Sequence, residues 1–171
     1  MKLIKQLLSI FILTVFSTKS FGQTSDLLDS LPGTKEEFIQ SEKKVLATIN
    51  WLENTPIDED PAKHKLQYAL LTAWITNSPT VTIEVNSRIL TFTKKNNDLI
   101  MLFMAGWTKY SLENNYAKDN LQGNLAGIRS AMKVYKQNPK SMKKDKEMEK
   151  LITLEEKGEL EKWAQEQLSA K

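Results

Sequence analysis

The sequence predicts an all-α protein, a single domain of about six helices arranged in stacked antiparallel helical hairpins. Apolar residues recur at helical spacing over residues 34–171, and capping residues and prolines divide them into segments. Six glycines and five prolines in 171 residues are too few for a disordered or fibrous chain. This length suits one domain, preceded here by a flexible lead-in over residues 23–33. An irregular helical bundle is the alternative arrangement.

The N-terminal segment 1–22 is expected to be a cleaved secretory signal peptide. Two lysines precede an apolar run over residues 7–16, and Ser20-Phe21-Gly22 supplies the small residues of a cleavage site before Gln23. The apolar run is well short of the roughly 20 residues that cross a bilayer, so a membrane anchor is disfavoured. The sequence therefore predicts export to the periplasm or beyond, with no integral membrane segment after cleavage.

Composition excludes several classes of site. The leader carries three lysines and no acidic residue, so the mature chain has 21 basic and 21 acidic residues. A balanced chain lacks the accumulated positive charge that nucleic acid or an anionic membrane surface requires. The absence of cysteine excludes disulfides, thiolate zinc sites, cysteine nucleophiles and a lipid-anchored N-terminus. No cofactor is expected.

The first two helices have clear start signals. A helix is predicted over residues 34–54, because Thr34 and Glu37 have the spacing of a capping box in front of an apolar stripe. A second helix is predicted over residues 60–77. Asp60 can cap it, and the proline that follows suits the first helical position.

Residues 80–95 support two interpretations. Val81, Ile83 and Val85 alternate as in a strand, and a returning arm after residue 87 would complete a hairpin. An isolated hairpin is marginal without a sheet to join. We therefore favour a short extended segment near 80–85, followed by a short helix.

Four further helices complete the predicted domain. Asp98 is the expected cap of the most apolar one, which should lie at the centre of the core, and Gly158 is the expected C-cap of the fifth helix. The predicted ranges are 99–114, 119–138 (opening at Asp119 or Asn120), 141–157 and 159–168.

An internal echo favours hairpins over a closed bundle. Trp74 and Trp107 lie 33 residues apart, and the same offset pairs Leu66 with Leu99. Tetratricopeptide-like helical hairpins, which stack into an α-α superhelix, have a similar period. Coincidence between two core helices explains the echo equally well.

Several short patterns together resemble an uncharacterised family of secreted helical proteins from Bacteroidetes-type bacteria. The resemblance implies an exported helical domain and carries no activity, cofactor or catalytic residue. The patterns are Ala73-Trp74-x-x-x-Ser78-Pro79, Gly106-Trp107-x-x-Tyr110-x-Leu112-Glu113-Asn114, Tyr135-Lys136-x-Asn138-Pro139 and the Gly22-Gln23 junction.

Metal and nucleophilic sites have weak support. His64 is the only histidine, lies between two lysines and is expected on a solvated helix face. No serine elbow accompanies it, so a serine–histidine–aspartate triad is disfavoured. Asp58, Glu59 and Asp60 could offer oxygen ligands to calcium, but they lack the spacing of a calcium loop. Helix capping is their plainer role.

Carboxylate chemistry is the one reaction class that the sequence leaves open. Some small helical enzymes cut glycans with a glutamic acid whose pKa is raised by apolar neighbours. Glu113 is the best candidate, at the end of the most apolar helix near Tyr110 and Tyr116. Glu84 is the second. An ordinary surface role is the alternative for each.

We favour a non-catalytic protein–protein interaction or scaffold module of the cell envelope, with an unknown envelope protein as partner. Charge is segregated: residues 133–146 carry six lysines and one aspartate, and residues 53–60 carry four acids and no base. Such a module should expose a groove or apolar patch lined by aromatic or methionine side chains. The candidate interaction residues are Trp107, Tyr110, Lys133, Lys136, Lys140, Lys143 and Lys144.

Two alternatives to the interaction module remain. One is an envelope glycan hydrolase acting through Glu113. The other is a carrier for a small ligand or lipid, which would need a closed cavity among Met101, Phe103 and Met104.

Overall fold

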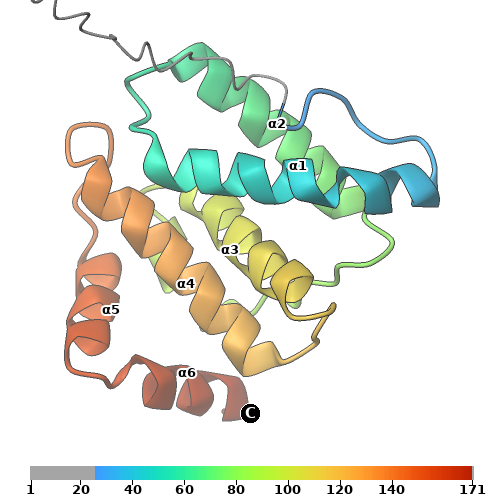
Figure 1. Ribbon diagram of the computed structural model, residues 1–171. Coiled ribbons are helices and arrows are strands. Elements are labelled where there is room, and N and C mark those ends of the chain that lie inside the picture. The colour runs from blue at the N-terminus through green and yellow to red at the C-terminus, as the bar shows by residue number, and fades with distance from the viewer. Residues whose placement is uncertain (1–25, 171) are drawn as a thin grey trace, which may run out of the picture.

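The computed structural model describes residues 26–170, and within this range the protein is an all-α single domain without strands (Figure 1). The predicted fold class is confirmed. The predicted signal peptide lies outside the described residues. The elements are α1 (Lys35–Asn54), α2 (Pro61–Asn77), the 3-10 turn η1 (Thr91–Thr93), α3 (Leu99–Glu113), α4 (Asn120–Gln137), α5 (Lys146–Glu156) and α6 (Leu160–Ser169).

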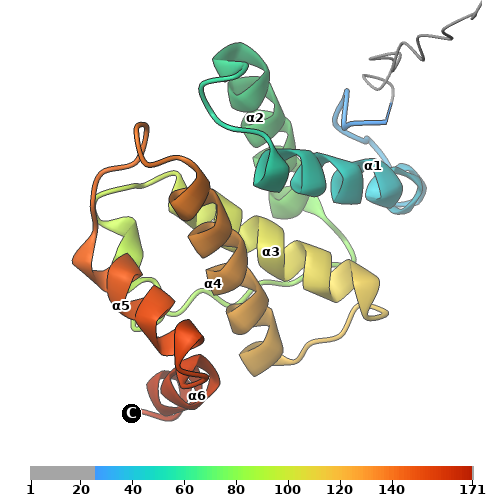
Figure 2. The same ribbon diagram turned by 60° about the vertical axis from the view of Figure 1, so that its left-hand side comes forward.

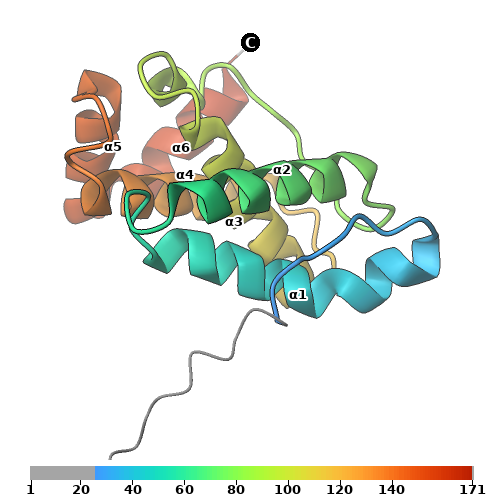
Figure 3. The same cartoon turned by 90° about the horizontal axis from the view of Figure 1, so that it is seen from above.

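The helices are arranged as three successive pairs (Figure 2). The α3–α4 pair lies in the middle and has the most extensive contact of any two helices. The α1–α2 pair covers one side of it, and the view in Figure 3 shows α2 running beside α1. The α5–α6 pair packs against α4 on the other side. The two outer pairs therefore both pack against the central pair.

Local capping explains most helix starts. The Thr34 Oγ1 accepts a hydrogen bond from the Glu37 amide at 3.3 Å, and the Glu37 carboxylate accepts one from the Thr34 amide at 3.1 Å. This is the predicted capping box. At the starts of α2 and α4 a single hydrogen bond does this, because Asp60 accepts from the Lys63 amide and Asp119 from the Gln122 amide, both at 3.0 Å. The N-terminal ends of these helices are thus fixed by interactions within a few residues.

Two predicted helix starts need correction. Asp98 precedes α3, but its side chain makes no capping hydrogen bond. The fifth helix begins at Lys146 rather than Ser141, because Asp145 accepts hydrogen bonds from the Glu147 and Met148 amides at 2.8 and 3.4 Å. The preceding residues are held as a loop instead.

The expected flexible lead-in is also corrected over its described part, residues 26–33. Leu27 and Leu28 are buried, and the Leu28 amide donates to Thr48 Oγ1 at 2.8 Å. This segment is therefore fastened to α1. Residues 23–25 of the lead-in lie outside the described range.

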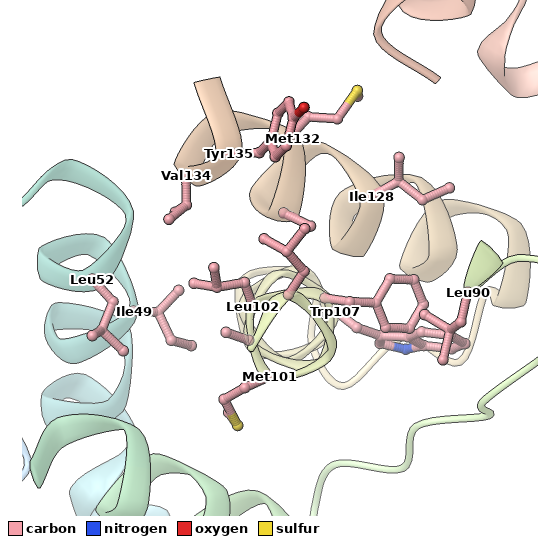
Figure 4. Close-up of a cluster of buried hydrophobic side chains, with 14 of the residues drawn as sticks. Ile49, Leu52, Leu90, Met101, Leu102, Trp107, Ile128, Met132, Val134 and Tyr135 are labelled. Carbon is pink, nitrogen blue, oxygen red and sulfur yellow. The ribbon is translucent and has the colours of Figure 1, made fainter. Parts of the chain in front are cut away.

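The core is centred on α3, as its apolar sequence predicts (Figure 4). Ile49 and Leu52 of α1 point toward α3, where Leu102 is fully buried. On α4, Val134 points toward α3, whereas Tyr135 lies on the side of α4 away from α3. Helix α4 is consequently apolar on two faces, one for α3 and one for α5.

Small residues allow α3 and α4 to approach closely. A Cβ atom added at Gly106 would lie 2.5 Å from the Ala126 carbonyl oxygen, and one added at Gly127 would lie 2.6 Å from the Phe103 ring. Neither position can hold a larger side chain without moving a helix. Gly127 thus serves helix packing.

Residues 78–98 connect α2 to α3 without a strand, so the hairpin alternative is wrong, and the predicted short helix is reduced to the three-residue 3-10 turn η1. Ile89 and Phe92 are fully buried, and Phe92 sits in η1 with its ring 6.4 Å from that of Phe103. The connection therefore contributes to the core although it has almost no regular structure.

Candidate functional site

Three hollows that share lining residues run along the outer surface of α4. The inner hollow, between α3 and α4, shares Arg129 and Lys133 with the middle one, and the middle shares Lys136 and Ile152 with the outer one. Their volumes are about 280, 390 and 420 Å³. We call them together the α4 groove. From Ala126 to Lys136 it follows about 15 Å of helix axis at 1.5 Å per residue.

The inner hollow is organised around Glu53, whose side chain is 7% exposed. Ser130 Oγ donates to Glu53 Oε1 at 2.7 Å, and Lys109 Nζ lies 3.3 Å from Oε2. Lys133 Nζ lies 4.0 Å from the same oxygen and donates to Asn54 Oδ1 at 2.7 Å. A buried carboxylate is stable only with such partners. Glu53 therefore ties α1 to α3 and α4.

Glu53 was not singled out from the sequence, where it counted as one acid of the 53–60 cluster. A signal was present: Glu53 follows Ile49 by four residues, on the apolar stripe of α1. An acidic residue on a buried stripe indicates a specific partner. The sequence does not show which residues of α3 and α4 provide it.

The outer hollow is the largest of the three and has an apolar floor. Tyr135, Pro139, Met142 and Ile152 line it between the end of α4 and α5. The Tyr135 hydroxyl accepts from the Asp145 amide at 3.1 Å and donates to the Glu149 carboxylate at 2.8 Å. These bonds hold the ring as one wall.

Lysines surround the outer hollow. Lys136 and Lys144 line it, and Lys140 and Lys143 are exposed on the same loop. Lys133, by contrast, is half-buried in the inner hollow, where it meets Glu53. The predicted lysine segment is therefore divided between two parts of the groove.

Two lysines from a distant part of the sequence join this loop. The Asn96 amide group donates to the Lys143 carbonyl and accepts from the Lys143 amide, both at 2.8 Å. Lys95 Nζ donates to the Lys144 carbonyl at 3.1 Å. Asn96 is buried, so Lys94 and Lys95 are held beside the α4–α5 loop. The sequence alone does not indicate that residues 94–96 lie beside this loop.

The acidic loop between α1 and α2 (residues 55–60) lies next to the lysine loop between α4 and α5 (residues 138–145) rather than on a separate face. The Ile57 amide donates to the Asn138 side chain at 2.8 Å, which fastens residues 55–60 to the end of α4. Asp60 is used as the α2 cap, and residues 26–170 contain no cluster of three or more potential metal ligands. The calcium candidates Asp58, Glu59 and Asp60 thus do not converge on an ion.

Neither candidate acid for glycan cleavage has the expected surroundings. Glu113 is exposed and lines the inner hollow together with Lys109 and Arg129. Apolar walls were the condition for its proposed role, and the structure places basic and polar groups there instead. Glu84 is also exposed, and its carboxylate accepts from the Asn120 side chain at 2.9 Å.

Of the two aromatic candidates, only Tyr110 reaches the groove. Trp107 is 2% exposed, and its ring meets that of Phe103 edge-on at 5.9 Å between centroids. A Cβ atom at Gly123 would clash with the same indole. Trp107 is a core residue, which corrects its prediction as an interaction residue.

His64 differs most from its prediction. It is 2% exposed, and its ring lies 4.5 Å from the Trp51 ring and 6.4 Å from the Tyr68 ring. Neither ring nitrogen has a hydrogen-bond partner. Burial lowers the His64 pKa, opposed by the nearby Pro56 carbonyl and the Asp60 charge. The neutral imidazole is the form that this site favours.

Comparisons with known proteins add no identification. No family model, no curated protein and no solved structure matches the chain. None of the helices in residues 26–170 is both long and apolar enough to cross a membrane. The α4 groove is therefore the feature of the molecule that bears on its function.

Proposed function

We propose that this protein is an exported, non-catalytic interaction module of the cell envelope, which binds a partner protein through the α4 groove. The groove carries the proposal, because it joins an outer hollow with an apolar floor to two neighbouring hollows lined by charged side chains, and apolar area beside a charged rim is the anatomy of a protein docking surface. The signal-peptide pattern of residues 1–22 and the resemblance to secreted helical proteins support export.

The two alternatives lack a comparable observation. Glycan cleavage required Glu113 between apolar walls, and its carboxylate lies among basic groups. A ligand carrier required an enclosed cavity among three core side chains. Of these, Met101 and Phe103 are buried in the packed core, and none of the three lines the groove.

Site-specific crosslinking in cells of the native host tests the proposal. A photoreactive residue replaces Gln137, which is exposed and lines the groove, and the matched control replaces Thr76, exposed on α2. We expect one reproducible protein adduct from position 137 and none from position 76. The same adducts from both positions, or none from either, would contradict docking in the groove.

A further inference from the structure

We infer that the outer hollow of the α4 groove accepts an acidic segment of the partner that carries one apolar anchor side chain. This inference rests on the proposed function and specifies the chemistry of the partner. Pro139, Met142 and Ile152 form a floor suited to one large aliphatic or aromatic side chain. The volume of about 420 Å³ exceeds what a single side chain fills, so neighbouring residues of the segment also enter.

The charge around this hollow favours acidic residues beside the anchor. Lys136 of α4 and Lys144 line the hollow, and four further exposed lysines lie on the α4–α5 loop and at residues 94–95. Within residues 26–170 none of the six forms an ion pair with a carboxylate. Unpaired cations on a rim steer and orient an oppositely charged partner. These lysines are Lys94, Lys95, Lys136, Lys140, Lys143 and Lys144.

The acids near the hollow do not neutralise this rim. Glu149 accepts from the Tyr135 hydroxyl, and both it and Glu156 line the hollow from α5. Residues 58–60 belong to the loop that Ile57 fastens to Asn138, and within residues 26–170 none of these acids forms an ion pair with the six lysines. We therefore expect the acidic residues of the bound segment to lie toward the α4–α5 loop.

A protein segment fits these features better than a lipid surface does. The backbone amides of a peptide can donate to the carboxylates of Glu149 and Glu156, which line the hollow, while its acidic side chains reach the exposed lysines. The apolar floor is a pocket between two helices rather than a protruding face. Anionic vesicles are nevertheless the appropriate competing probe.

The experiment is selection of random twelve-residue peptides displayed on phage against the purified protein. We expect enriched peptides with aspartate or glutamate flanking one large apolar residue, and binding that weakens as salt is raised. Reversing two rim charges, in the double variant Lys136→Glu with Lys144→Glu, should weaken binding about tenfold or more. Met142→Ala should weaken binding without changing its salt dependence.

A matched control keeps the net charge equal. The double variant Lys43→Glu with Lys65→Glu changes exposed lysines of α1 and α2, away from the groove, and should bind like the unchanged protein. Circular dichroism of each variant verifies the fold.

Three results would overturn the inference. Enriched peptides that need Met142 but carry no acidic excess would remove the charge argument and leave groove docking intact. Absence of any peptide whose binding depends on the groove would also refute it, while the crosslinking result would still decide the proposed function. Rim-dependent binding to phosphatidylglycerol vesicles without peptide binding would assign the lysines to a membrane surface instead.

Discussion

His64 and Glu53 are buried polar residues with opposite environments. Glu53 has a hydroxyl and two lysines around its carboxylate, so its charge is compensated. His64 has aromatic neighbours and no hydrogen-bond partner, so a charge there would be poorly compensated. His64 is therefore the one of the two whose site disfavours a charge.

The stability of the fold should decrease as pH falls below the ordinary histidine pKa of about 6.5. Because burial lowers the His64 pKa, the unfolded chain binds a proton at a pH where the folded chain does not. The loss begins near pH 6.5 and continues until the folded pKa is reached. Each unit of lowering corresponds to about 1.4 kcal/mol of unfolding free energy. Urea denaturation at pH 7.5 and 5.5 measures it.

The variant His64→Phe provides the comparison. It keeps a ring between Trp51 and Tyr68 and removes two unsatisfied nitrogens, so the fold should persist. Asp60 and Glu59 attract the imidazolium ion, while Lys63, over the Trp51 ring, opposes it. An equal change of the urea midpoint between the two pH values in both proteins would show that His64 is not responsible.

At the scale of elements, helix ends follow local chemistry, and helix spacing follows side-chain size. The capping box at Thr34 and the caps at Asp60 and Asp119 were all visible as short patterns. Asp145 caps α5, and the start was misplaced at Ser141 because Lys143 is held in the preceding loop by Asn96, 47 residues earlier. No local pattern contains that constraint.

Gly106→Ala should destabilise the protein, although alanine is normally the better helix former. Its Cβ atom would lie 2.5 Å from a backbone oxygen of α4, which cannot move alone. We expect a loss of about 1–3 kcal/mol in unfolding free energy from such overpacking, measured by urea denaturation.

Gly33→Ala is the matched control. Its added Cβ atom would meet its nearest neighbour, the Glu37 carboxylate, at an ordinary 3.5 Å. The control should change the unfolding free energy by less than about 0.5 kcal/mol. Equal effects at the two glycines would contradict the account of close α3–α4 packing.

For the molecule as a whole, the three helix pairs are joined by more than apolar contact. Hydrogen bonds from Ile57 to Asn138 and from Asn96 to Lys143 connect segments 81 and 47 residues apart. Both connections lie near the C-terminal end of α4. The groove is therefore bounded by parts of the chain that are fixed relative to one another.

The protein should consequently unfold in one cooperative transition. Neither outer pair can keep its apolar contacts once α3 and α4 separate. Thermal melts followed by far-ultraviolet circular dichroism and by tryptophan fluorescence should coincide, because the four tryptophans lie in all three pairs, on α1, α2, α3 and α6. Two separated transitions would indicate that one outer pair unfolds independently.

The sequence by itself determined the all-α class, the order of the helices and most of their ends, because apolar periodicity and capping act over a few residues. It also singled out Tyr110, Lys133, Lys136 and Lys144, which line the groove. Only the tertiary structure decided that His64 and Trp107 are buried, that Glu53 meets Ser130, and that Lys94 and Lys95 join the lysine loop. These features arise from contacts between residues far apart in the chain, and such contacts leave no periodic trace in the sequence.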